Sequence, residues 1–261
     1  MHITELLTYP LKSSAPIRHT HCRGTTVGLL GDRQFGLFAQ DGHKLFSLRN
    51  NPLLAKQSVH VSDHTLTLTN LVDGRCHSFA LVPQGEARVE VWRRALPALT
   101  YGEELNAFFS TLVGTPVLFA QPLLPAANTD VDLTFMDGGA LHLVNRHSVM
   151  ALGEAINMPF IDPSIFRPNL VIDDCPVLAE NTHQALRIND VVFDVVERTN
   201  RCVAINLLAQ ALGLDTQPLP LKALKAFNGG SGAHFGVYLR PRGAFTLSLG
   251  DAVTVITDPR H

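Results

Sequence analysis

Two stretches organise this sequence: FRPNLVI at residues 166–172 and ERTNRC at residues 197–202. In the first stretch, Pro168 biases Arg167 toward an extended backbone, so we expect Arg167 to stand at the mouth of a strand. The apolar run that follows the proline predicts that this strand is short and buried. The second stretch ends with Cys202, 35 residues after Arg167.

Cys202 is close in sequence to two cations, Arg198 and Arg201. Positive charge near a thiol favours the thiolate, which attacks electrophiles and binds soft metals. Together with Arg167, this pattern predicts an anion clamp beside an activated sulfur. The alternative is that Cys202 is a buried, unreactive small hydrophobic residue, which is the common role of an isolated cysteine. The residues alone leave both interpretations open.

The composition is that of a folded globular protein: the chain has 261 residues, of which 46% are hydrophobic and 17% charged. A net charge of −2 without a basic run gives no sign of nucleic-acid binding. No apolar run approaches the roughly 20 residues that span a bilayer, and the N-terminus lacks a signal-peptide pattern. The four cysteines form no C-x-x-C pair, which argues against a zinc ribbon or a cysteine-ligated iron–sulfur cluster. We therefore expect a cytoplasmic protein that contacts neither nucleic acid nor membrane.

The N-terminal part of the chain is rich in short runs typical of strands, separated by turn residues. The run TLTLT at residues 65–69 alternates as a half-exposed strand does. Many short strands at this spacing predict a barrel or a sandwich over residues 1–95. An apolar face at the i, i+3, i+4, i+7 spacing then predicts a helix over residues 101–112. We place a second domain at residues 96–261, with the boundary between 95 and 135.

The second half of the chain mixes the two kinds of element, so the predicted class is mostly β (α+β) with a few helices laid against a sheet. The predicted helices cover residues 147–156, 207–212 and 221–227, and the predicted strands cover residues 141–144, 191–196, 235–239, 244–249 and 253–256.

Cationic and hydroxyl side chains gather near the first strand. The segment YPLKSS at residues 9–14 places Lys12 and Ser13 at the end of that strand, where they could hold a phosphate through charge-assisted hydrogen bonds. They could also be an ordinary solvated strand end. Arg33, in the next Gly-Asp-Arg turn, could reach the same anion, or it could pair locally with Asp32.

A second set of polar residues surrounds the strand predicted at 141–144. Asp137 precedes this strand, and Asn145 and Ser148 follow it into a helix. Asn145 or Ser148 can cap that helix, and free N–H groups at a helix start attract anions. Capping alone also explains both residues. The glycine-rich segment at 228–236 follows a helix instead of a strand and matches no phosphate-loop motif.

In chain order, several motifs resemble those of the MOSC family in its two-domain form. They are Y-P-L-K-S, G-D-R, a Trp near position 92, F-M-D, N-x-x-S, F-R-P-N-L-V-I, N-R-C and G-D-A-V-T-V. The match covers almost the whole chain, and the near relatives would be the amidoxime-reducing proteins of mitochondria and their bacterial counterparts. The resemblance implies an N-terminal β-barrel-like domain followed by a MOSC β-barrel domain with a few flanking helices.

The resemblance also implies a function. It implies a molybdenum–molybdopterin cofactor between the two domains and the reduction of N-hydroxylated compounds such as hydroxylaminopurines and amidoximes. By position, Cys202 would be the metal ligand and catalytic residue. The cofactor-binding residues would be Lys12, Ser13 and Arg33 on the phosphate-bearing tail, Asp137, Asn145 and Ser148 along the pterin, and Arg167, Asn169 and Arg201 around the rest of the pocket.

Two departures from the family pattern shape the remaining expectations. Some bacterial relatives carry a ferredoxin-like module, but this sequence stops soon after Gly250-Asp251 and lacks the cysteines for it. We therefore expect no iron–sulfur cluster in this chain and a separate flavin or iron–sulfur protein as electron donor. In addition, an apolar helix follows Cys202 where a Thr-rich turn is expected.

Two other functions are alternatives to a reductase. One is a non-catalytic carrier of the molybdenum cofactor or its sulfur, and the other is a barrel that binds another small anion.

Overall fold

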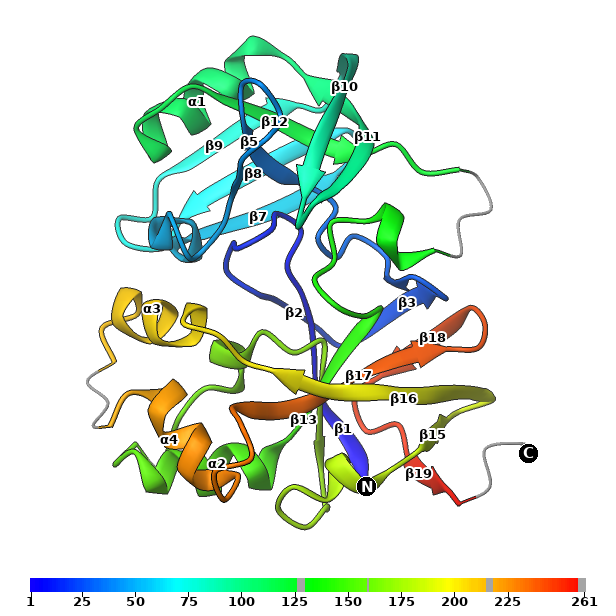
Figure 1. Ribbon diagram of the computed structural model, residues 1–261. Helices are drawn as coiled ribbons and strands as arrows, with labels where there is room; N and C mark the ends of the chain where they lie inside the picture. Colours follow the sequence, from blue (N-terminus) through cyan, green and yellow to red (C-terminus); the bar gives the residue numbers. More distant parts are fainter. Residues whose placement is uncertain (126–129, 159, 215–217, 258–261) are drawn as a thin grey trace. The chain divides into compact units, whose positions relative to one another are not determined.

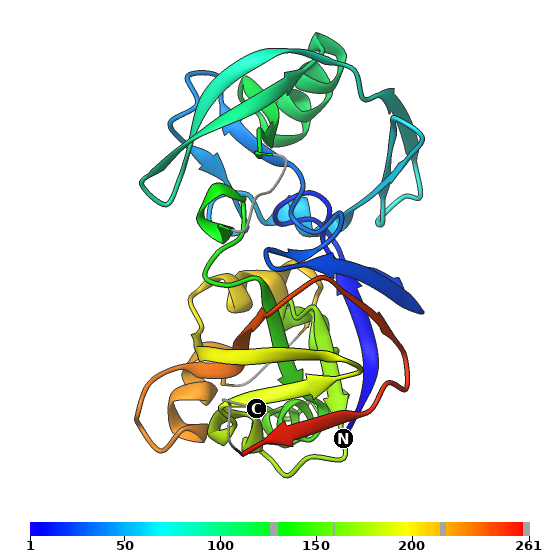
Figure 2. The same ribbon diagram turned by 90° about the vertical axis from the view of Figure 1, so that its right-hand side faces the viewer.

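The computed structural model describes residues 1–125, 130–158, 160–214 and 218–257, and it consists of two compact units (Figures 1 and 2). The first unit comprises residues 1–8, 18–30 and 137–261, and the second comprises residues 9–17 and 31–136. The chain therefore passes from one unit to the other four times.

Strand pairing, and not sequence order, decides this division. Strand β1 (His2–Thr8) is antiparallel to β14 (Leu170–Asp173), with Leu6 opposite Leu170. The first strand thus belongs to the unit that holds the C-terminal half, whereas the domains expected from the sequence, 1–95 and 96–261, are contiguous. Local apolar patterns identify a strand but not a partner so far away in the chain.

An eight-stranded sheet forms the centre of the first unit, in the order β19-β15-β16-β17-β13-β14-β1-β2. The neighbours from β19 to β13 are antiparallel, and β13 and β14 are parallel. Its other strands are β2 (Ile17–His19), β13 (Leu141–Asn145), β15 (Ala185–Ile188), β16 (Val191–Asn200), β17 (His234–Pro241) and β19 (Val253–Ile256). A three-stranded sheet in the order β18-β3-β4 completes the unit, with β3 (His21–Thr25), β4 (Gly28–Leu29) and β18 (Phe245–Ser248).

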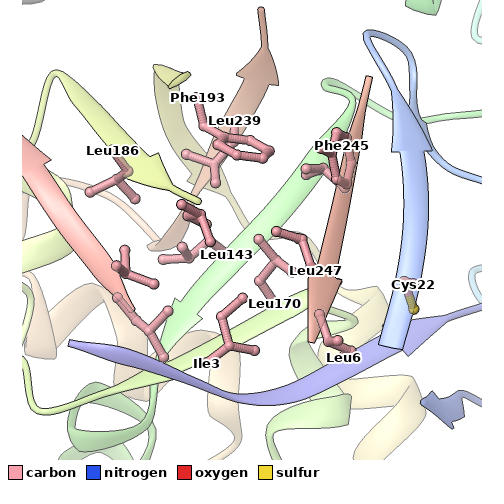
Figure 3. Packing of buried hydrophobic residues seen from close by; sticks show 14 of the residues in the cluster. Ile3, Leu6, Cys22, Leu143, Leu170, Leu186, Phe193, Leu239, Phe245 and Leu247 are labelled. Atoms are coloured by element: carbon pink, nitrogen blue, oxygen red, sulfur yellow. The ribbon is translucent and has the colours of Figure 1, made fainter. Parts of the chain in front are cut away.

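The two sheets of the first unit share one hydrophobic core, shown in Figure 3. Strands β13, β14 and β17 each contribute residues two apart, such as Leu141 and Leu143, as expected when one face of a strand is buried. In β1, however, the core residues are Ile3 and Leu6, three apart. A register shift between Ile3 and Glu5 explains this spacing, because a bulge turns the following side chains to the other face.

Among the described residues of the first unit, three segments are helical: α2 (Arg146–Ala155), α3 (Ala204–Ala211) and α4 (Pro220–Phe227). Both α2 and α3 pack against α4. All three were predicted, although α3 begins three residues before the predicted Leu207. The short 3₁₀ turns η3 (Pro163–Phe166) and η4 (Ala179–Thr182) connect the strands.

The second unit is built from two further sheets. One has the order β10-β11-β12-β5-β6, and the other is the meander β7-β8-β9. Their strands are β5 (Gly36–Ala39), β6 (Leu45–Phe46), β7 (Gln57–Ser62), β8 (Thr65–Asn70), β9 (Cys76–Ala80), β10 (Pro83–Val91), β11 (Arg94–Tyr101) and β12 (Val117–Pro122), with short turns η1 (Pro52–Lys56) and η2 (Val131–Leu133).

Helix α1 (Glu103–Val113) packs on β12 of the second unit. It buries Leu105 and Phe109, and the ring of Phe109 is stacked on Phe119 at 5.3 Å between centroids. The apolar face predicted for this helix is confirmed. The mostly β class is confirmed as well, and no helix in the described ranges has the length and apolarity needed to cross a membrane.

Candidate functional site

Arg201 brings the two organising stretches together within the first unit. Its Nη2 donates a hydrogen bond of 2.9 Å to the carbonyl oxygen of Phe166, and its backbone N donates one of 2.7 Å to Ala233 O. The ring of Phe166 in turn lies 4.1 Å from that of Phe235, measured between centroids. The end of β16, the residue before Arg167 and the start of β17 therefore meet at one place.

Cys202 lies at this meeting point, between the end of β16 and the start of α3. Its carbonyl oxygen accepts a bond from Ile205 N at 3.3 Å, which begins the turn into the helix. The side chain of Cys202 is half-buried, whereas those of Cys22 and Cys175 are 8% and 2% exposed. The interpretation of Cys202 as a buried side chain is therefore wrong.

Arg167 does not have the extended backbone predicted from the proline after it. Its φ and ψ are 54° and 47°, in the left-handed region, which few residues other than glycine adopt. The cause is local: Asp162 caps η3 by accepting from Ser164 N, and Arg167 N donates to Ser164 O to close the turn. The left-handed residue then redirects the chain into β14. Its position ahead of that buried strand agrees with the prediction.

Asn169 is a structural residue of the first unit. Its Nδ2 donates to Leu7 O at 3.1 Å, and its Oδ1 accepts from His142 N at 3.1 Å. Its backbone N also donates to His142 O, and its backbone O accepts from Leu7 N. Asn169 thereby joins β1 to β13. Asp137, by contrast, is exposed in the bend ahead of β13.

Asn145 and Ser148 are buried, and both belong to a hydrogen-bond network around Glu180 that was not predicted from the sequence. Asn145 caps α2, as predicted, by accepting from His147 N at 3.0 Å. Its Nδ2 donates to Glu180 Oε2 at 3.2 Å, and Ser148 Oγ donates to Glu180 Oε1 at 3.1 Å. Burial raises the pKa of the Glu180 carboxyl, although these hydrogen bonds act in the opposite direction. Nothing in the sequence around Glu180 indicates a buried carboxyl.

The candidates near the first strand lie together in the second unit. Lys12 and Arg33 are only 4% and 8% exposed, which is unusual for cations. Lys12 Nζ donates to Phe135 O at 2.7 Å, and Ser13 Oγ accepts from Leu48 N at 3.1 Å. These two residues are therefore not a solvated strand end.

Arg33 pairs with its neighbour, as one of the two interpretations predicted. Its Nη1 lies 2.5 Å from Asp32 Oδ2, and its guanidinium carbon lies 4.3 Å from the ring centroid of Tyr9. Asp32 also accepts from Tyr9 N at 2.7 Å. This arrangement fixes a guanidinium in the same unit as Lys12.

Trp92 and Arg49 extend this cationic group, and no sequence motif indicated that Arg49 belongs to it. The Arg49 guanidinium carbon lies 4.6 Å from the Trp92 ring centroid, and Lys12 Nζ lies 5.7 Å from it. Across the described ranges, by contrast, no group of three His, Cys, Asp or Glu side chains is arranged to hold a metal ion.

Two family models match the sequence. The MOSC N-terminal beta barrel domain matches residues 1–116, and the MOSC domain matches residues 130–254. Together they cover most of the chain and include every candidate residue discussed above.

Among known proteins, the mitochondrial amidoxime-reducing component 1 of Danio rerio is 25% identical over 98% of this chain and 85% of its own length. A molybdenum cofactor sulfurase of Oryza sativa subsp. japonica is 23% identical over 92% of this chain. The chain spans 32% of that sulfurase, about a third of its length. Among solved structures, the YuaD protein of Bacillus subtilis aligns over 97% of this chain and 93% of its own, with a TM-score of 0.48 and 10% identity.

Proposed function

The chain belongs to the MOSC family, in the form with an N-terminal β-barrel domain, and on that premise we propose that it is a molybdenum-cofactor-dependent reductase of N-hydroxylated compounds. The substrates that we propose are hydroxylaminopurines and amidoximes. The distant relationship to amidoxime-reducing components supports this choice.

The observation that carries the proposal is the hydrogen bond from Arg201 to Phe166 O. It holds the segment that carries Arg167 against the segment that carries Cys202, so two arginines and a half-buried cysteine belong to one local structure. Arginine suits an anionic ligand because its guanidinium group stays protonated and can donate two parallel hydrogen bonds to the same ligand.

The residues of this chain fit a molybdenum–pterin cofactor in chemical type. A half-buried thiol is a suitable soft ligand for a transition metal, and the cations Lys12 and Arg33 suit a phosphate ester. Asn145 and Ser148 fit less well as pterin contacts, because both are fully buried and bonded to Glu180. The Asn169 side chain is likewise bonded within the first unit. We therefore restrict the proposed cofactor-binding residues to Arg167, Arg201 and Cys202 in the first unit and to Lys12, Ser13 and Arg33 in the second.

When bound, the cofactor supplies two-electron redox chemistry, and the protein supplies position and charge. The overall reaction consumes two electrons and two protons: the N–O bond of the substrate breaks, an N–H bond forms, and the oxygen leaves as water. In this scheme Cys202 Sγ would hold the metal, and Arg167 and Arg201 would contribute positive charge for the anionic cofactor. The electrons come from a separate donor protein of the flavin or iron–sulfur type.

A test of this function compares the wild type with Cys202→Ser after expression in a host that makes the cofactor. We expect close to one molybdenum per wild-type chain and a large loss in the variant, because a serine hydroxyl is a poor soft ligand. Viologen-coupled reduction of a hydroxylaminopurine and of an amidoxime should decrease in parallel.

Cys76→Ser is the matched control, since Cys76 is exposed on β9 of the second unit. It should leave both molybdenum content and turnover unchanged. Full activity in Cys202→Ser would refute the ligand assignment. Molybdenum without turnover on either substrate would favour the alternative of a cofactor or sulfur carrier, which the relationship to cofactor sulfurases supports.

A further inference from the structure

A pocket lies where helices α3 and α4 of the first unit pack together (Figure 1). Its volume is about 370 Å³, within the range of small-molecule sites. None of its described lining residues belongs to the cofactor-binding residues proposed above. They are Asn206 of α3 and, in α4 or just before it, Pro218, Leu219, Leu221, Lys222 and Lys225.

A hydrogen bond between the two helices holds this pocket together. Asn206 Oδ1 accepts from Leu221 N at 2.9 Å. Leu221 lies in the first turn of α4, where backbone N–H groups have no partner four residues earlier within the helix. Pro220, ahead of it, has no N–H group to satisfy. The Asn206 side chain therefore caps α4 and fixes the start of this helix against α3.

Positive charge gathers at the pocket. Helix α4 buries Ala223 and Leu224, whereas Lys222 and Lys225 are exposed. The two lysines are three residues apart, so they are neighbours on the helix surface. The sequences of α3 and α4, AINLLAQA and PLKALKAF, contain no acidic residue. Two like charges therefore stand side by side, and an anion bound by both would offset their repulsion.

The rest of the lining is largely apolar. Pro218, Leu219 and Leu221 contribute hydrocarbon surface, and Leu219 is 36% exposed. An apolar group that covers these side chains removes them from water, which is favourable. The pocket thus combines an apolar wall with two ammonium groups. This combination suits a ligand that has an apolar body and one anionic end.

We propose that the α3–α4 pocket binds an apolar monocarboxylate, a carboxylic acid anion that carries an aliphatic chain or a ring. The carboxylate accepts charge-assisted hydrogen bonds from the ammonium groups of Lys222 and Lys225. The apolar body packs on Leu219 and Leu221. A cation of the same length is repelled by the lysines, and a short carboxylate lacks the apolar contact. The inference is independent of the proposed reductase function, because it requires neither molybdenum nor turnover.

The test is a titration of the full-length, isotope-labelled protein with octanoate, followed by amide chemical shifts. We expect saturable shifts at amides of α3 and α4, and none with acetate or octylammonium at the same concentrations. The double variant Lys222→Ala/Lys225→Ala should bind octanoate about tenfold more weakly or worse, as expected for the loss of charged hydrogen-bonding partners. Leu219→Ser should also weaken binding, because it removes part of the apolar wall.

Lys44→Ala is the matched control, since Lys44 is an exposed lysine of the second unit. It should bind octanoate as the wild type does. All the substituted side chains are exposed, so the variants should keep the thermal midpoint of the wild type. An equal response to octylammonium would show adsorption to apolar surface only and would overturn the proposal. Unchanged affinity in the double variant, no saturable response in the wild type, or shifts centred outside α3 and α4 would overturn it as well.

Discussion

Single residues decide the chemistry available near Cys202. Cys202 is half-buried, in the short link between β16 and α3. Asn145, Ser148 and Asn169 have the residue types of ligand contacts, but their side chains are bonded to other parts of the first unit. A polar side chain can bind a ligand or can bond to another part of the protein. Residue type alone cannot separate these two roles, because both satisfy hydrogen-bonding groups.

Glu180 leads to a prediction about pH. Burial raises the pKa of its carboxyl above the ordinary value of 4.5. The stabilisation associated with the protonated form is fully present below that ordinary value and is lost as the pH rises through the raised value. We therefore expect the difference in unfolding free energy, wild type minus Glu180→Gln, to decrease from pH 4 to pH 7.

Urea denaturation at several pH values measures this difference. The pKa of Asp162 is lowered from its ordinary value of 3.8, because hydrogen bonds from Ser164 and the charge of Arg18 outweigh the effect of burial, so Asp162 titrates below this interval. Other groups do titrate within it. They titrate equally in both proteins, so they cancel. A difference that stays constant with pH would show that Glu180 has the same pKa in the folded and unfolded chains.

At the scale of elements, the parallel β13–β14 pair and its neighbour β17 position the site. Gly236 in β17 has a φ of 72°, and a Cβ there would lie 2.4 Å from Leu143 O and 2.6 Å from His142 Nε2. The adjacent Phe235 packs on Phe166, whose carbonyl oxygen holds Arg201. The glycine therefore permits the close approach of two strands directly beside the site.

We predict that Gly236→Ala destabilises the protein by at least about 1–2 kcal/mol, the cost of a left-handed non-glycine residue, with more from the clash. It should also lower molybdenum retention, measured after purification. Gly243→Ala is the control, because Gly243 lies in the same unit and its Cβ would meet nothing within 4 Å. Equal thermal midpoints for the two variants would contradict the argument.

Several elements could be predicted from the local sequence pattern, and strand β11 was missed for a local reason. The faces of α1 and α2 followed from apolar spacing, and β14 followed from its buried run. Strand β11 was not predicted, because Pro97 interrupts it and a proline removes a donor from the sheet. The strand tolerates Pro97 because its pairing to β12 begins only at Ala98.

At the scale of the whole molecule, each unit has its own core, and the first unit is discontinuous in sequence. Leu6 on β1 is fully buried opposite Leu170. We predict that Leu6→Ala lowers the unfolding free energy by about 2–5 kcal/mol, through lost burial and the cavity left behind.

Hydrogen exchange would locate the damage from Leu6→Ala. Amides of β13 and β14 should lose protection, although the mutation is near the N-terminus. Leu249→Ala, at a position 43% exposed in the same unit, should have little effect. Loss of protection confined to residues 31–95 would contradict the assignment of β1 to the first unit.

The sequence by itself determined the mostly β class, the main helices and the motif that ends in Cys202, because strand and helix periodicity and short motifs are local properties of the chain. Only the tertiary structure decided that β1 joins the C-terminal half, that Arg201 bonds to Phe166, and that Arg49 and Lys12 face Trp92. These contacts join residues far apart in sequence. Which of these contacts form depends on which surfaces and charges can be buried together, and a local sequence pattern does not contain that information.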